Sequence, residues 1–462
     1  MSARRWLPLI AACIGTFLLL TYATITTIAV PAIAVGLDGS TGAMSWVVDA
    51  YTLALAALLV GMGALGDAWG RKRLYICGLV VFLVATAVCA IAPDVTVLVV
   101  ARGAQGIAGA AMFATLLPLL GDAYSGRDRH VAFAAWGAVA GLAAGIGNVA
   151  GGLLTQSFDW RAVFYFGIPV AAVALAMAVF CFADSERGDG NIDWAGIVLF
   201  TLAAVAAVLG VTWGGDIGWA SSSTVLAFLI AIGALTAFVS WQRRGSSPML
   251  DPALFRSLKF DGVLVAAFGY YLAAYGPLVV LSLWLQNGLE LSASAAALVL
   301  SIQPLAFVFV SALCGSRLQR VDLRLSLGFG TVLCGIGCVA MLYVLAEPVW
   351  PALIAALIAG LILTGVGSAM VSPVLPGAAM SDAPAERAGT ASATANSSRQ
   401  FGLAVGIALC GSLFAGPDEF ALLWPLVFCA GVGMLTGLVS ILLFSRSSTP
   451  ATVQPIAERA HT

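Results

Sequence analysis

Two charged residues stand inside apolar stretches of this sequence, where charge is costly. Arg102 lies in LVVARGAQGIAGAA (98–111) and Asp49 in WVVDAYTLALAALL (46–59). A charged side chain within hydrocarbon normally faces a polar cavity or a partner. Desolvation favours the neutral carboxyl group, whereas a nearby arginine favours the carboxylate. A carboxyl group between these two influences can take up and release a proton, so we predict that Asp49 and Arg102 form a proton-coupling region.

Each of these two residues also has a plainer interpretation. The long side chain of Arg102 could extend to the lipid headgroups, and Asp49, about one turn from the start of its stretch, could face exterior water. Both alternatives stay open at the level of the sequence.

The segment GALGDAWGRKRL (63–74) is a second candidate site. Glycines allow a sharp turn and close approach of helices, and an acid beside several arginines suits a switchable clamp. We predict a conformational gate formed by Gly63, Asp67, Gly70 and Arg71. A basic cluster that only stops membrane translocation would explain the arginines, but neither Asp67 nor the glycine spacing.

Glycines are also dense in GAVAGLAAGIGNVAGGLL (137–154). Small residues four apart let helices pack backbone to backbone, and so many of them favour bending or sliding against a neighbour. We single out Gly147, Asn148, Gly151 and Gly152 as the functional part of this segment. Ordinary structural packing is the alternative.

Tyrosines and a few amides are the candidates for a substrate cavity. Aromatic rings with scattered polar groups suit apolar or cationic aromatic ligands in a membrane cavity. The candidates are Tyr22, Gln105, Tyr271 and Tyr275. Core packing of the same rings is the competing interpretation.

The composition determines which elements must position these residues. Of 462 residues, 61% are hydrophobic and 9% are charged, whereas soluble domains are about 25% charged. Most of the surface must therefore face lipid, and an all-α polytopic membrane protein is expected. The net charge of −1 without a basic block gives no support for a nucleic-acid partner.

Metal and nucleotide sites find no support either. His130 and His461 fall in an expected loop and in the tail, and no CxxC pair occurs. Neither Lys72 nor Lys259 lies in the frame that cradles ATP phosphates. We predict no metal and no cofactor, with an ion gradient as the source of energy.

Apolar runs of about 20 residues mark membrane-spanning helices. The expected spans are 7–30, 46–66, 74–92, 95–119, 131–154, 162–182, 193–213, 224–241, 260–285, 295–315, 324–345, 350–373, 398–416 and 420–444. If the N-terminus is cytoplasmic, all of the 21 basic residues except Arg102 and Arg161 fall on the cytoplasmic side. The positive-inside rule thus favours about fourteen spans, with both termini in the cytoplasm.

An internal repeat is suggested by the loops GALGDAWGRKRL (63–74) and CGSRLQRVDLRL (314–325), of which the second is a degenerate echo of the first. We therefore expect two six-helix bundles plus an inserted helix pair. The predicted units are an N-terminal bundle at 1–182, the inserted pair at 183–241, a cytoplasmic loop at 242–259, a C-terminal bundle at 260–444 and a tail at 445–462.

Several segments together resemble the fourteen-span drug:proton antiporter branch of the major facilitator superfamily. They are the 63–74 loop, Arg102 with Gln105 and Gly106, WVVDAY (46–51), DWRAVF (159–164), SPMLDPALFR (247–256), WLQNGLELS (284–292) and RAGTASATANSSRQFG (387–402). The resemblance covers nearly the whole chain. It implies an alternating-access transporter fold and a role for Arg102 in proton coupling.

Two departures from the family pattern bear on mechanism. The segment TYATITTIAVP (21–31) has Tyr22 and Thr27 where the family carries an acid and an asparagine, so Asp49 takes more of the expected proton handling. Gly147 is followed by Asn148 where a proline that kinks the helix is usual. This second departure bears on the direction of transport.

We therefore predict a proton-coupled exporter of amphipathic drugs, antibiotics or secondary metabolites. It is expected to be a monomer in the plasma (inner) membrane, with a small-molecule substrate, protons and lipid as its partners. Proton-coupled uptake or uniport of a metabolite is the alternative. An enzyme is not expected, because no cluster of His, Cys or paired acids lies at one membrane depth.

Overall fold

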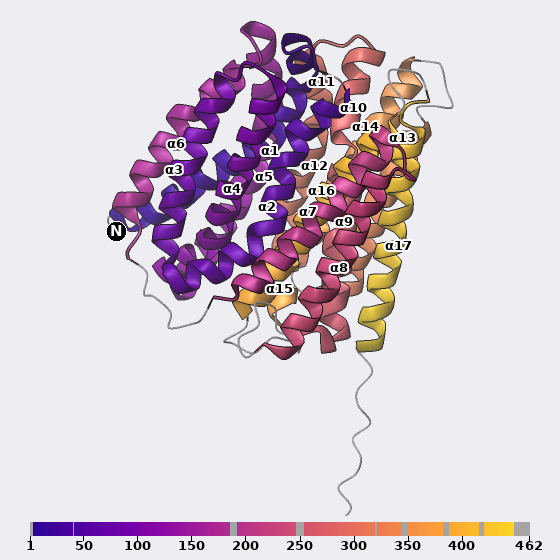
Figure 1. Ribbon diagram of the computed structural model, residues 1–462. Coiled ribbons are helices and arrows are strands. Elements are labelled where there is room, and N and C mark those ends of the chain that lie inside the picture. The colour runs from indigo at the N-terminus through magenta and orange to yellow at the C-terminus, as the bar shows by residue number, and fades with distance from the viewer. Residues whose placement is uncertain are drawn as a thin grey trace, which may run out of the picture.

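The computed structural model describes residues 3–39, 41–184, 192–245, 254–318, 321–343, 350–381, 388–414 and 420–447. Over these residues the chain is helical, and long helices run side by side between two ends (Figure 1). In the orientation of Figure 1, the α1–α2 connection lies at the upper end and the α2–α3 connection at the lower end.

The first part of the chain forms eight long helices after a short 3-10 turn, η1 (Ala3–Trp6). They are α1 (Leu7–Gly36), α2 (Thr41–Trp69), α3 (Arg71–Ala90), α4 (Val95–Ala123), α5 (Gly126–Ser157), α6 (Ala162–Cys181), α7 (Trp194–Ile217) and α8 (Ser222–Arg244). We refer to α1–α6 as the N-terminal group.

The second part, which we call the C-terminal group, contains several interrupted helices. Its elements are η2 (Leu254–Arg256), α9 (Leu258–Tyr275), α10 (Leu278–Leu283), η3 (Trp284–Gly288), α11 (Ala293–Leu300), α12 (Ile302–Leu318), η4 (Arg324–Phe329), α13 (Gly330–Leu342), α14 (Trp350–Val371), α15 (Leu375–Met380), α16 (Ala388–Leu413) and α17 (Leu423–Ser447). Of these, η3 and η4 are π-helical turns. Pro277 separates α9 from α10, because proline has no backbone N–H to donate to the preceding turn.

Twelve described segments are long and apolar enough to cross a membrane. The interrupted run α9–α10–η3 counts among them as one segment, Leu258–Gly288. The helices α5 and α16, of 32 and 26 residues, are not among the twelve. The count includes only residues whose side chains the structure describes, and several residues of α5 fall outside them. The helix α16 begins with small polar residues, which lower its hydropathy without preventing helix formation.

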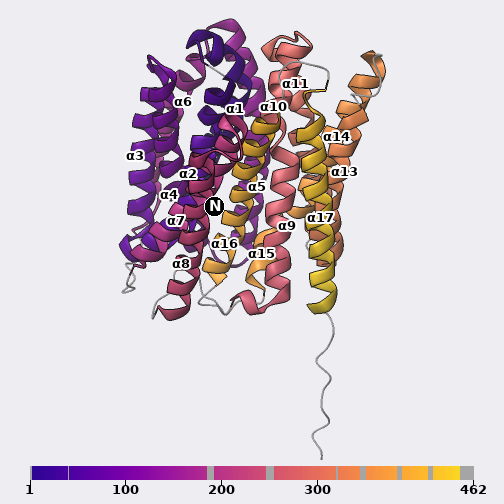
Figure 2. The same ribbon diagram turned by 45° about the vertical axis from the view of Figure 1, so that its right-hand side comes forward.

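The two groups pack in matching patterns (Figure 2). In the N-terminal group α1 contacts α5 and α6, while α3 contacts α4 and α6. In the C-terminal group α9 contacts α16 and α17, while α13 contacts α14 and α17. The pair α2–α4 likewise corresponds to α12–α14. A repeated contact pattern of this kind is the structural counterpart of an internal repeat.

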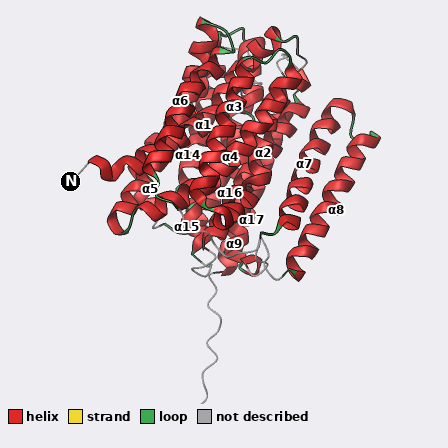
Figure 3. Cartoon of the chain, turned by 60° about the vertical axis from the view of Figure 1, so that its left-hand side comes forward, coloured by secondary structure: helices red, strands yellow, loops and turns green. Residues whose placement is uncertain are grey.

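The helices α7 and α8 pack mainly on each other. Figure 3 shows them beside the remaining helices. Of the two, α7 contacts α2 of the N-terminal group and α16 of the C-terminal group.

The groups meet directly along two seams. One seam joins α2 to α16, and the other joins α5 to α11 and α12. Near the upper end, the Gln286 side-chain amide also donates to the Ile28 carbonyl oxygen at 3.3 Å, which ties the C-terminal group to α1.

One expected span begins in the wrong place. The sequence placed its start at 398 and left Arg399 beside the cytoplasmic loop, but α16 starts at Ala388. Arg399 therefore lies roughly 16 Å along the helix at 1.5 Å per residue. The run ASATANSSRQ is too polar to read as membrane-spanning, and it is nevertheless helical because α9, α2 and α7 pack against α16.

Candidate functional site

Arg102 of α4 is fully buried, at 0% exposure. Its Nε donates to the Val47 carbonyl oxygen at 2.9 Å, one terminal nitrogen donates to Gln105 Oε1 at 2.9 Å, and the other reaches the Tyr22 carbonyl oxygen at 3.4 Å. The guanidinium carbon lies 4.4 Å from the centre of the Tyr51 ring. The side chain is therefore directed into the helix packing, where protein dipoles and an aromatic face solvate the charge.

Close approach of α2 and α4 makes these bonds possible. Gly106 lies one turn after Arg102, and a Cβ at this position would collide with the Tyr51 carbonyl oxygen and fall 2.8 Å from the Ala54 Cβ. Only glycine lets the two backbones come this near. The Val47 carbonyl is thereby brought within reach of the Arg102 side chain.

Gln105 orients Arg102 and is itself anchored. Its amide nitrogen donates to Thr86 Oγ1 at 2.7 Å, and the Thr86 hydroxyl donates to the Phe82 carbonyl oxygen at 2.6 Å. Gln105 is 0% exposed. Gln105, which was predicted to line a substrate cavity, thus belongs to a chain of hydrogen bonds that joins α4 to α3.

Asp49 of α2 is also 0% exposed, but neither carboxyl oxygen has a hydrogen-bond partner among the described residues. The face of α2 that carries Val47 and Tyr51 is turned to α4, and it lies about 200° around the helix from Asp49. Asp49 shares its own face with Leu53 and Ala56.

That face of α2 packs against α7 and α16. Leu53 clusters with Val208 of α7 and Ala404 of α16, and the Ala56 carbonyl oxygen accepts from the Ser397 hydroxyl of α16 at 3.1 Å. The structure therefore places Asp49 on the seam between the two groups, and it does not bring Asp49 into contact with Arg102 through any hydrogen bond or ion pair of the described residues.

The predicted gate lies at the lower end. Gly70 has φ +105°, a conformation that favours glycine, and it joins α2 to α3 without a loop. One terminal nitrogen of Arg71 contacts the two Asp122 carboxylate oxygens at 2.9 and 3.3 Å, which links α3 to α4. Nothing presses against Gly63 within 4 Å, and the side chain of Asp67 lies outside the described residues. Sequence analysis did not identify Asp122, which follows an apolar run and has no motif around it.

The glycines of α5 make two different contacts. A Cβ on Gly147 would meet Thr21 and Thr24 of α1, and one on Gly151 would fall 2.8 Å from the Ile25 carbonyl oxygen, also in α1. Gly152 instead faces the C-terminal group, as described below. Asn148, between them, is buried at 4% exposure.

Three tyrosines of α9 form a continuous aromatic cluster. The ring centres of Tyr270 and Tyr271 are 5.2 Å apart, and those of Tyr271 and Tyr275 are 4.6 Å apart. Arg399 of α16 joins the cluster, since its guanidinium carbon lies 4.9 Å from the Tyr271 ring centre. The same carbon lies 5.8 Å from the ring of Phe113 in α4, across the interface between the groups.

Tyr22, the remaining cavity candidate, is used in packing. It is 1% exposed, and its hydroxyl donates to the carbonyl oxygens of Val163 and Phe164 at 2.9 and 3.1 Å. These bonds join α1 to α6. Arg399, like Asp122, was not among the residues predicted from the sequence, although it stood in one of the segments that carried the family resemblance.

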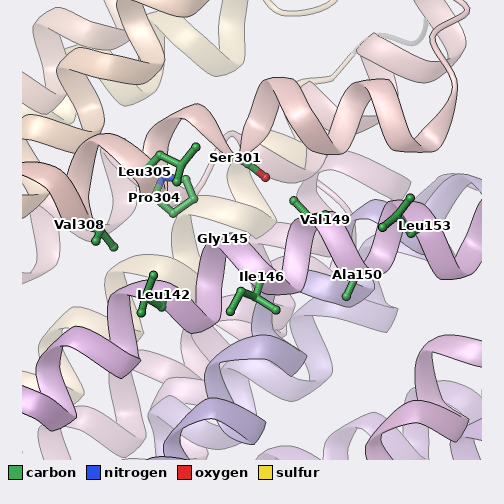
Figure 4. Close-up of a pocket in the computed structure, with 10 residues that line it drawn as sticks. All are labelled: Leu142, Gly145, Ile146, Val149, Ala150, Leu153, Ser301, Pro304, Leu305 and Val308. Atoms are coloured by element: carbon green, nitrogen blue, oxygen red, sulfur yellow. The ribbon is translucent and has the colours of Figure 1, made fainter.

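An apolar cavity of about 350 Å³ lies along the seam between α5 and α11–α12 (Figure 4). Its lining residues are Leu142, Gly145, Ile146, Val149, Ala150, Leu153, Ser301, Pro304, Leu305 and Val308. Leu153 and Leu305 are 54% and 61% exposed. An exposed apolar surface of this kind suits contact with lipid rather than with water.

Comparison with known proteins agrees with this geometry. The sequence model described as Major Facilitator Superfamily matches residues 12–244 and 263–462. The multidrug resistance protein Stp of Mycobacterium tuberculosis is 32% identical over 422 residues, which cover 90% of this chain and 77% of that protein. A probable actinorhodin transporter of Streptomyces coelicolor is 30% identical over 423 residues, covering 90% of this chain and 73% of that protein.

Among solved structures, the peptide transporter POT in complex with sulfate aligns with a TM-score of 0.72 at 15% identity. The alignment covers 95% of this chain and 94% of that one. At this level of identity the likeness concerns the fold alone.

Proposed function

Since this chain belongs to the Major Facilitator Superfamily, we propose that proton entry drives its transport cycle. The chain is a multi-pass membrane protein and an efflux transporter of drugs or metabolites, and its relatives are named for multidrug resistance and for actinorhodin transport. We place it in the plasma (inner) membrane as a monomer with both termini in the cytoplasm, so that the lower end of Figure 1 is cytoplasmic.

The repeated contact pattern supports an architecture of fourteen spans. In this proposal α1–α6 form the N-terminal bundle, α9–α17 form the C-terminal bundle, and α7–α8 are the inserted pair. The helices α5 and α16 complete the count of twelve apolar segments to fourteen. Alternating access then corresponds to rocking of one bundle against the other about the two seams.

The observation that carries the coupling proposal is the position of Asp49. A buried carboxylate without a hydrogen bond is costly, whereas the neutral acid is far less so. The packed seam between α2, α7 and α16 therefore suits the protonated acid. Release of the proton requires the carboxylate to gain water or a donor, and this requires the seam around Asp49 to loosen.

Arg102 has a complementary role in this proposal. It holds the opposite face of α2 through the Val47 carbonyl and the Tyr51 ring. A change of packing at Asp49 is therefore transmitted to the N-terminal bundle through a fixed attachment. Gly70, Arg71 and Asp122 hold α2, α3 and α4 together at the lower end, so these helices move as one body.

The test is transport in inside-out vesicles with an imposed pH gradient. We expect Asp49→Asn to abolish gradient-driven substrate accumulation while the protein remains in the membrane at the wild-type level. The matched control is Asp38→Asn, which removes an exposed carboxylate just beyond the end of α1 and should leave transport unchanged.

Undiminished accumulation in the Asp49→Asn vesicles would remove Asp49 from the coupling mechanism. Substrate movement in the opposite direction under the same gradient would instead identify an uptake transporter.

A further inference from the structure

The middle of the interface between the two bundles carries an arginine. Arg399 stands near the midpoint of α16 and is partly exposed, as are Tyr271 and Tyr275 of α9. Partial exposure at this depth, between packed bundles, means that these side chains border a space large enough for water. A cation here is costly unless a ligand or a partner compensates it.

The described surroundings of Arg399 contain no compensating acid. Within the part of the chain that the structure describes, the groups that interact electrostatically with Arg399 are Tyr270, Tyr271 and Tyr275, and no carboxylate is among them. The Nε of Arg399 is buried without a hydrogen-bond partner. Arg102, by contrast, has its nitrogens bonded to carbonyl and amide oxygens.

A further unpaired polar group follows Arg399 in α16. The side-chain oxygen of Gln400, the next residue of α16, is buried without a hydrogen-bond partner. The Tyr270 hydroxyl, by contrast, interacts with Arg399 and with Ser372. Buried polar groups of native proteins are nearly always paired. Unpaired groups on and next to one cation indicate a place where a ligand supplies the missing bonds.

The rings around Arg399 come from both bundles. Tyr271 belongs to α9 and Phe113 to α4, and the guanidinium lies 4.9 and 5.8 Å from their ring centres. Aromatic faces of this kind stack on planar apolar molecules, and guanidinium binds carboxylate, phenolate or sulfonate oxygens through charge-assisted hydrogen bonds.

We propose that Arg399, Tyr271, Tyr275 and Phe113 form a subsite that selects anionic aromatic compounds among the exported molecules. The ligand's acidic group pairs with Arg399, and its ring system stacks between the side chains of the two bundles. This inference rests on the efflux function proposed above and specifies its substrate class. It runs against the preference for cations that a lone membrane acid such as Asp49 suggests.

Two dyes with the same xanthene ring and opposite charge test the proposal. Fluorescein is anionic and rhodamine 6G is cationic at neutral pH. Retention of each dye is measured in cells that lack their own exporters and express wild type, Arg399→Gln, Arg399→Lys or Arg243→Gln. Arg243 is exposed at the end of α8, so its variant is the matched control for the loss of one positive charge.

Loss of a hydrogen bond to a charged group reduces binding by about tenfold or more. We therefore expect wild type and Arg243→Gln to export fluorescein and Arg399→Gln to export it at least about tenfold more slowly, with rhodamine 6G efflux maintained. Arg399→Lys keeps the charge and loses the planar stacking, so its rate of fluorescein efflux should lie between those of wild type and Arg399→Gln. Fluorescein polarisation with purified protein should show the same order of affinities, and thermal unfolding should show that Arg399→Gln is folded.

Three results would overturn the proposal. An equal decrease in the efflux of both dyes in Arg399→Gln would assign Arg399 a structural role. Unchanged fluorescein efflux in that variant would also reject the subsite. Export of rhodamine 6G but not fluorescein by wild type would reject the anionic substrate class and leave the efflux function standing, whereas failure of gradient-driven transport in the vesicle experiment above would reject the efflux function itself.

Discussion

The contact between Gly152 and the C-terminal group gives the sharpest test of how the two bundles close at the upper end. A Cβ on Gly152 would lie 2.7 Å from the Ala297 Cβ, 2.8 Å from the Ala293 carbonyl oxygen and 2.9 Å from the Ser294 Cα. Two of these three atoms belong to backbone, which cannot rotate away. The change Gly152→Ala therefore forces α5 away from α11.

The magnitude follows from the cost of overpacking. One added methyl group at a closely packed contact costs about 1–3 kcal/mol. The contact joins opposite bundles, so this cost applies to the conformation whose upper end is closed and is relieved when that end opens. A bias of this size changes the ratio of closed to open molecules about 5–150-fold.

Spin labels at the upper end measure this ratio. Val35 and Asn287 are exposed near the upper ends of α1 and η3, and pulsed electron resonance between labels at these positions, in a background without the native cysteines, reports their separation. We expect wild type to be mainly in the short-distance population. In Gly152→Ala, much of this short-distance population should shift to longer distances between the labels.

The matched control is Gly145→Ala, on the same helix and facing the same bundle. A Cβ on Gly145 would make only an ordinary contact with Pro304, at 3.6 Å. Its distance distribution should match that of wild type. An unchanged distribution in a folded Gly152→Ala protein would refute the idea that this contact closes the upper end.

Two further variants probe the N-terminal bundle. Gln105→Leu leaves one Arg102 nitrogen without its acceptor and removes the bond that Gln105 donates to Thr86. We expect this variant to lose about 1.5–3 kcal/mol of stability, measured as a lower unfolding temperature, and to transport more slowly. Wild-type stability would show that water replaces the amide. Gly70→Ala places a side chain at φ +105°, and we expect a loss of about 1–3 kcal/mol in the free energy of unfolding, whereas an unchanged unfolding temperature would mean that the α2–α3 junction relaxes.

Membrane-spanning segments were largely predictable from the sequence because apolar length alone defines a span. The run from Arg71 to Ala90, for example, was expected as a helix within a few residues of its observed bounds. The start of α16 was not predictable in this way. Its first turns are polar and helical because neighbouring helices cover them, and hydropathy does not contain this information.

The candidate site was predictable by residue but not by arrangement. Sequence identified Asp49 and Arg102 as unusual, yet their relative placement depends on which face of α2 meets α4. The glycine at 106 decides this, since it lets α4 approach the face that carries Tyr51. The ion-pair partner of Arg71 could not be predicted from the sequence either, because Asp122 lies on another helix.

The helices α7 and α8 cover only one of the two seams between the bundles, so the two sides of the protein differ in the surface that they present to lipid. The helix α7 contacts both α2 and α16 and so covers one of the two seams between the bundles. The other seam, between α5 and α11–α12, contains the apolar cavity. A compound dissolved in the membrane can therefore contact the apolar cavity beside α5 directly, whereas α7 covers the seam between α2 and α16.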